Sequence, residues 1–179
     1  MALGCQFVFD PVYAQLSKAI GDYDSDTQME RAEDLYQASL LAIDEINGPD
    51  DSSVLSAWQR IKDWAESLQV PANLEASYVM SEMQALYPQK AEYAGETALL
   101  QLYESAVGDC QAYHCDQPRP IMLLSILKFA FGSGCLQDPL YGWIATTLDR
   151  NVDKHSGESF LQLERKAIIW LDAVLSKIN

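Results

Sequence analysis

The amino-acid sequence predicts an all-α protein, a compact single-domain bundle of about seven or eight helices over residues 1–179. Apolar residues recur at spacings of three and four along most of the chain, which is the period of an amphipathic helix. Only 9 Gly and 7 Pro occur in 179 residues, so the chain has few places to turn. No pair of alternating segments joined by a hairpin turn is found. With 49% hydrophobic residues, the chain can build one proper core.

The first two helices are expected over residues 11–20 and 26–46. Asp10 suits the N-cap of the first helix, and Pro11 suits its first helical position. The second helix ends at 47–49, because Asn and Gly favour a C-terminus and Pro prevents continuation. Its apolar stripe consists of Met29, Ala32, Tyr36, Leu40 and Ile43.

The next three helices are expected over 53–68, from about 72 to 86, and over 90–107. Asp51 or Ser52 can cap the third helix, whose stripe contains Leu55, Trp58, Ile61, Ala65 and Leu68. The fourth follows Pro71 and stops at Tyr87–Pro88. Gly108 is expected to be the C′ residue of the fifth.

The sixth helix, near 119–131, is expected at the centre of the bundle. Its run "IMLLSILKFAF" is apolar on every side, as in a fully buried helix. The run is too short to span a bilayer and contains Lys128. After "GSG" at 132–134, two more helices are expected over about 137–151 and 157–178, and the last has an apolar stripe wide enough to face the core.

The net charge of −14 lies entirely in one part of the chain. Residues 1–115 contain 19 Asp and Glu against 5 Lys and Arg, whereas residues 116–179 contain 7 of each. Nucleic acids and anionic membranes are bound through Lys and Arg, so an acidic field disfavours both. A basic protein partner is compatible with this field, and acidity can also serve solubility alone.

No residue of the chain is expected to be catalytic, and no cofactor is expected. The two histidines, His114 and His155, lack the spacing of a metal-binding helix motif. Neither a nucleophile elbow nor a glycine-rich phosphate loop is present. The four scattered cysteines do not suggest a disulfide framework, and the N-terminus resembles no secretion signal, which favours a cytoplasmic protein.

The segment "GDYDSDTQMERAE" at 21–33 resembles a calcium loop in the spacing of its acidic residues. An EF-hand loop requires glycine at its sixth position for a sharp turn, and Thr27 occupies that position. The same residues fit a capping box, in which Ser25 and Gln28 bond each other's backbone. We therefore expect the acidic start of a helix, and calcium binding is the third function considered.

A zinc site would require Cys110, His114, Cys115 and Cys135 to converge. Their spacing matches no standard ligand pattern, and adjacent residues such as His114 and Cys115 point apart in most backbone conformations. The sequence does not determine whether the four converge, and no metal site is predicted.

The leading hypothesis for function is a non-enzymatic, acidic protein-binding domain. It would cover a basic surface of a partner, as inhibitors and immunity-type proteins cover the cationic site of a nuclease. The alternative is a helical domain that binds a small apolar ligand or cofactor between its helices, beside the 121–131 helix and the Cys110–Cys115 loop. Trp64 and Trp58 cannot share a helix face, and Trp64 is the candidate for the exposed anchor. The predicted partner-binding residues are Asp44, Glu45, Asp50, Asp51, Asp63, Trp64 and Glu66.

Overall fold

The computed structural model describes residues 9–16, 28–149 and 156–177. No strand occurs in these ranges, and the predicted all-α fold is confirmed. The α-helices are α2 (Gln28–Asn47), α3 (Ser52–Glu66), α4 (Ala76–Leu86), α5 (Pro88–Ala112), α6 (Pro118–Phe131), α7 (Gly142–Asp149) and α8 (Ser156–Leu175). The structure also contains three short 3-10 helices. They are η2 (Pro11–Tyr13), η3 (Pro49–Asp51), which leads into α3, and η4 (Pro139–Tyr141), which leads into α7.

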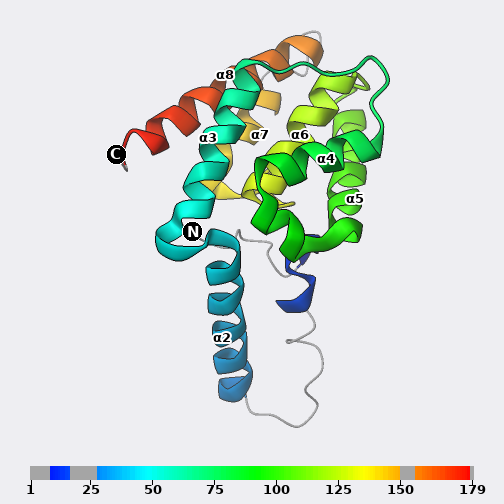
Figure 1. Cartoon of the computed structure of the whole chain (residues 1–179). Coiled ribbons are helices and arrows are strands. Elements are labelled where there is room, and N and C mark those ends of the chain that lie inside the picture. Colours follow the sequence, from blue (N-terminus) through cyan, green and yellow to red (C-terminus); the bar gives the residue numbers. More distant parts are fainter. Residues whose placement is uncertain (1–8, 17–27, 150–155, 178–179) are drawn as a thin grey trace.

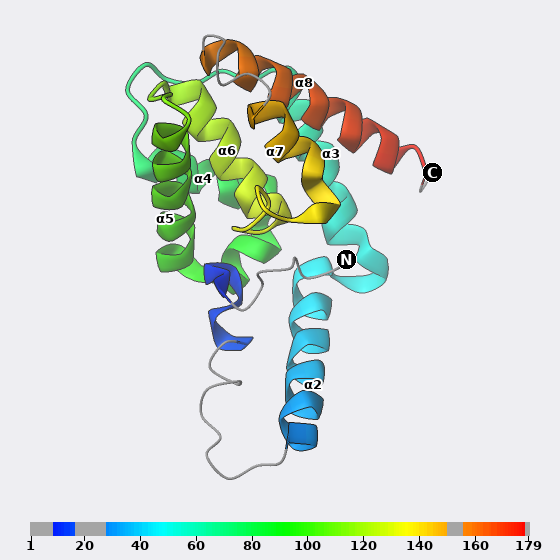
Figure 2. The ribbon, with the colours of Figure 1, turned by 180° about the vertical axis from the view of Figure 1, so that it is seen from behind.

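Helix α6 lies at the centre of the bundle, as its composition predicts. Every side chain from Met122 to Phe131 is buried. Helices α3, α4, α5 and α8 all contact it and surround it in the bundle (Figures 1 and 2). Its burial on all sides explains why polar residues are nearly absent from its sequence.

None of the helices in the described ranges has the length and apolar character needed to cross a membrane.

Helix α5 differs most from the sequence prediction. It starts at Pro88, directly after α4, and continues through Gly108 to Ala112, so the predicted end at Gly108 is wrong. The positive φ expected at a C′ glycine occurs instead at Gly95, where φ is 75° and the helix is kinked. Tertiary contacts with α4 and α6 along α5 outweigh the small cost of a helical glycine.

An aromatic cluster joins α8 to the rest of the bundle. The Trp170 ring lies 5.9 Å from Trp58 of α3 and 4.9 Å from Phe131 of α6, measured between ring centroids. Tyr141 and Trp143 approach the same indole at 5.8 and 6.4 Å. Aromatic pairs at these separations add stability beyond their buried area.

Two lysine side chains bind backbone carbonyls, one at the C-terminus of α6 and one in the turn after it. Lys90 of α5 donates from Nζ to the carbonyl oxygen of Ala130, at 3.2 Å. Lys128 donates to the carbonyl oxygen of Ser133 at 2.9 Å. The final carbonyls of a helix have no partner within it; Lys90 supplies a donor to one of them, and Lys128 binds the turn that follows the helix.

Asp10 secures the turn that follows α6. Its carboxylate accepts from the backbone N–H of Ser133 at 2.6 Å and from that of Val12 at 2.9 Å, so it caps η2 as expected and also holds the turn. Gly132 has φ 105°, and a Cβ there would lie 3.2 Å from Asp10 Oδ2. The positive φ favours glycine at this position, and the space beside Asp10 is also tight for a larger residue.

Candidate protein-binding surface

Helix α2 extends away from the bundle along most of its length (Figures 1 and 2). Its buried residues are Ala42, Ile46 and Asn47, all within its last six positions. The described elements that contact it are α3, α5 and η3. Large apolar side chains are therefore exposed on it, including Tyr36 at 58% and Leu41 at 69% of their maximal areas.

Three of the exposed apolar residues of α2 form a stripe, whereas Leu41 lies about 120° round the helix from Met29. Successive residues turn a helix by about 100°, so Met29, Tyr36 and Leu40 lie within a sector of about 40°. Glu33 and Asp44 lie in the next sector on the same side. Ala42 and Ile46, which face the bundle, lie on the other side of the helix. The stripe that the spacing predicts is exposed at these three residues and bordered by carboxylates, whereas its last member, Ile43, is half-buried.

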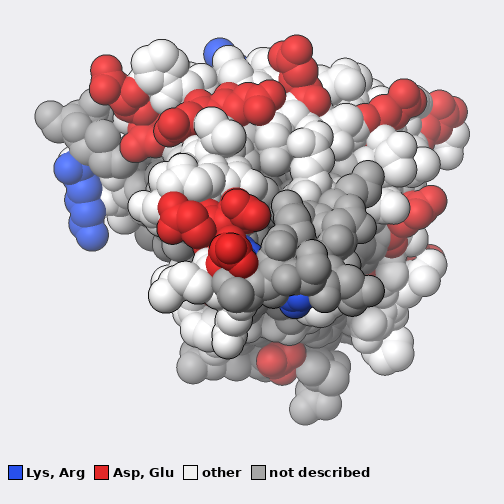
Figure 3. Space-filling view, turned by 90° about the horizontal axis from the view of Figure 1, so that it is seen from below, with Lys and Arg blue, Asp and Glu red and all other residues white. Residues whose placement is uncertain are grey.

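The charge of α2 is strongly acidic. Its sequence contains Glu30, Glu33, Asp34, Asp44 and Glu45 against the single base Arg31, and all six side chains are exposed. Seen from the end at which α2 projects, acidic side chains dominate the charged atoms of the surface (Figure 3). A cationic partner would meet this field first.

Four of the predicted residues lie at the corner between α2 and α3. Asp44 and Glu45 are on the last turn of α2 before Ile46, and Asp50 and Asp51 are in η3; all four are exposed. The corner is fixed in place, because Tyr87 donates its hydroxyl to the carbonyl oxygen of Ile46 at 3.2 Å. The structure therefore presents these four carboxylates at one corner, which this hydrogen bond ties to the bundle.

The two pairs of carboxylates lie at opposite kinds of helix end, so their negative charges affect helix stability in opposite directions. Asp50 and Asp51 precede α3, whose N-terminus favours negative charge. Asp51 also accepts from Asn47 Nδ2 at 2.7 Å, which holds the two aspartates in a left-handed turn with φ of 52° and 58°. Asp44 and Glu45 lie near the C-terminus of α2, where negative charge costs about 0.3–1 kcal/mol each. Helix stability accounts for the first pair and not for the second.

The other three predicted residues lie at the far end of α3. Asp63 and Glu66 are exposed, and at 1.5 Å per residue they are about 20 Å along the helix from the corner. Trp64 is partly buried and packs against the core, as Trp58 does. The structure does not bring this group together with Asp44 and Glu45, and the exposed aromatic side chain of α2 is Tyr36, eight residues before Asp44.

No metal centre is formed by the described residues, because no three His, Cys, Asp or Glu side chains there lie where they could hold one ion. Cys110, Cys115 and Cys135 are buried free thiols, whereas His114 is exposed. Burial raises the pKa of Cys110 and of Cys135 to about 12, so both thiols stay protonated and are poor ligands.

The calcium hypothesis concerns a segment that lies partly outside the described residues. Residues 21–27, which include Thr27 and the proposed cap at Ser25, lie outside the described residues. Residues 28–33 are helical within α2, whereas an EF-hand loop needs several of them in an extended turn.

A polar cleft of about 430 Å³ lies beside the Lys128–Asp109 ion pair and is lined also by Ser105 and Gln137. Lys128 Nζ lies 2.6 Å from Asp109 Oδ2, and it donates at 2.9 Å to Ser105 Oγ as well as to Ser133. Lys128 therefore donates two hydrogen bonds and forms one ion pair within the protein. The cleft is therefore lined by an ion pair and by neutral polar side chains.

Comparisons of the chain with protein-family models, with curated proteins and with solved structures find no match.

Proposed function

We propose that this protein is a non-enzymatic, acidic protein-binding domain that takes up a basic partner on α2 and on the adjoining corner. The observation that carries the proposal is the face of α2, where Met29, Tyr36 and Leu40 are exposed beside Glu33 and Asp44. Apolar side chains grouped on a projecting helix are typical of a docking surface. Bordering carboxylates select a cationic partner and accelerate its approach.

Asp44 and Glu45 strengthen this interpretation. They reduce the stability of α2 slightly, and residues kept at such a cost are expected to serve function. The proposed surface therefore includes Asp44, Glu45, Asp50 and Asp51, and it leaves out the distant group of Asp63, Trp64 and Glu66. A nuclease or another nucleic-acid-binding protein is the partner class that this charge suits best, because its own site is cationic.

Charge reversal on α2 tests the proposal. The variant Glu33→Lys, Asp34→Lys, Asp44→Lys is expected to bind a basic partner, captured from extract of the source cells at low salt, about 100-fold more weakly. Each reversed charge at an interface rim is taken to contribute about 1 kcal/mol. The measurement is a titration of the purified partner at about 50 mM salt.

A charge-matched variant serves as the control. Glu75→Lys, Glu104→Lys, Asp116→Lys changes the net charge equally, and all three side chains are exposed away from α2. Its affinity is expected to fall by less than about threefold, since only the general field is altered. Equal losses in the two variants, or binding that does not respond to added salt, would overturn the assignment of the surface to α2.

A further inference from the structure

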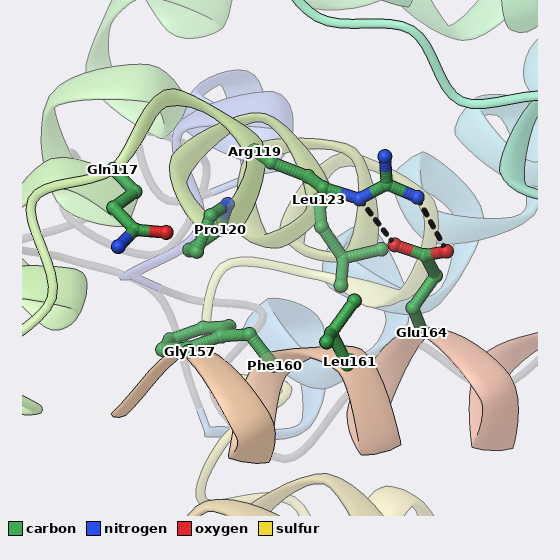
Figure 4. A pocket seen from close by; sticks show the side chains of 8 residues that line it. All are labelled: Gln117, Arg119, Pro120, Leu123, Gly157, Phe160, Leu161 and Glu164. Carbon is green, nitrogen blue, oxygen red and sulfur yellow. Dashed lines mark hydrogen bonds and ion pairs between the residues drawn. The ribbon is translucent and has the colours of Figure 1, made fainter. Parts of the chain in front are cut away.

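An apolar slot of about 160 Å³ lies between the first turns of α6 and α8 (Figure 4). Pro120 and Leu123 of α6 line one wall, and Phe160 and Leu161 of α8 line the other. Engineered cavities of about 150 Å³ with similar linings in other proteins bind benzene. The size and lining of the slot therefore suit a single ring.

One end of the slot is closed by an ion pair (Figure 4). Arg119 donates from Nε and Nη2 to the two carboxylate oxygens of Glu164, at 2.9 and 2.8 Å, and from Nη1 to the carbonyl oxygen of Leu68 at 3.1 Å. The guanidinium is held on three sides and its charge is balanced. A ligand therefore meets no net charge at this end of the slot.

The other end presents the side chain of Gln117. Its amide makes no hydrogen bond to another described residue, and it lines the slot together with Gly157. A side-chain amide contains both a donor and an acceptor. Gln117 is exposed, so a ligand at this end exchanges a hydrogen bond with water for one with the side-chain amide.

We propose that the slot binds a neutral, ring-sized apolar molecule whose one hydrogen-bonding group faces Gln117. An anionic ligand is disfavoured by the net charge of −14. A cationic ligand is disfavoured because Glu164, the carboxylate in the lining, is already paired with Arg119. The Cys110–Cys115 loop, which the sequence suggested as a pocket wall, is not part of the lining. This site is independent of the protein-binding function proposed for α2.

Three probes of equal ring size test the proposal: benzyl alcohol, benzylamine and benzoate, titrated into the whole protein while amide NMR signals are followed. Benzyl alcohol is expected to give saturable shifts around the slot with a Kd between about 0.05 and 1 mM. The two charged probes are expected to bind at least tenfold more weakly. Absence of saturable shifts with benzyl alcohol, or tighter binding of either charged probe, would overturn the proposal.

Two variants locate the site. Leu161→Trp places an indole at the rim of the slot and is expected to weaken the binding of benzyl alcohol at least tenfold. Ile169→Trp, on the same helix but outside the slot, is expected to leave this affinity unchanged. Both positions are exposed, at 47% and 67%, so folding tolerates the change. Gln117→Leu, at a position whose side chain makes no capping bond, is expected to weaken the binding of benzyl alcohol about fivefold. The affinity for toluene, which has no hydrogen-bonding group, is expected to stay the same. Undiminished binding of benzyl alcohol in Leu161→Trp and Gln117→Leu would contradict the site.

Discussion

Replacement of Asp109 by alanine is expected to lower the free energy of unfolding by about 3 kcal/mol, a loss typical of a broken buried ion pair. Lys128 is 4% exposed at its side chain, and Asp109, 30% exposed, is its only anionic partner among the described residues. Without that carboxylate, the ammonium group stays buried with two neutral acceptors. Denaturant unfolding followed by circular dichroism measures the change.

An exposed ion pair provides the matched control for Asp109→Ala. Lys62 lies 2.6 Å from Asp172, whose side chain is 65% exposed, and Asp172→Ala is expected to cost less than about 1 kcal/mol. The double variant Asp109→Leu, Lys128→Met is expected to cost less than Asp109→Ala alone, because no unpaired charge remains. If Asp109→Ala and Asp172→Ala lowered the free energy of unfolding by similar amounts, the stabilising effect of Asp109 would not come from pairing with a buried charge on Lys128.

The second large effect concerns Lys90 and pH. Burial lowers the pKa of Lys90 to about 8 from 10.5, with Asp10 and Cys135 as the nearby groups that oppose the shift. Between these two values the unfolded chain binds the proton and the folded protein releases it, so stability rises with pH. The full rise is about 3 kcal/mol, and about 2 kcal/mol of it falls between pH 7 and 10.

Lys90→Met isolates this contribution. The difference in unfolding free energy, wild type minus variant, is expected to increase by about 2 kcal/mol from pH 7 to pH 10. Cys110 and Cys135 act in the opposite direction above pH 9, since burial raises the pKa of each thiol, but both are present in the two proteins and cancel. A difference that stays constant with pH would mean that Lys90 is not held in a desolvated site.

The central helix could be predicted from sequence because its apolar run has no polar face. The same reasoning could not place the ends of α5, because Gly95 and Gly108 are equally permissive and only tertiary contacts decide between them. Nor could it join Lys90 to the C-terminus of α6. Lys90 is forty residues from the carbonyl it binds, and no local pattern indicates that contact.

The candidate surface was predicted in part. Charge and the helix end drew attention to Asp44 and Glu45, which lie on the projecting helix. The spacing predicts the stripe that contains Met29, Tyr36 and Leu40, but spacing alone does not tell whether a neighbouring helix covers an apolar face. The slot beside Leu123 depends on the packing of α6 against α8 and leaves no signal in either segment alone.

Hydrogen exchange on the complex tests the central claim most directly, since it reports which backbone amides a partner covers. Residues 28–41 of α2 have no buried side chain, so their amides are expected to exchange quickly in the free protein. On addition of the basic partner at low salt, protection is expected to rise in α2 and at Asp50 and Asp51, and to stay constant in α8. Protection confined to other helices, with α2 unchanged, would contradict the account.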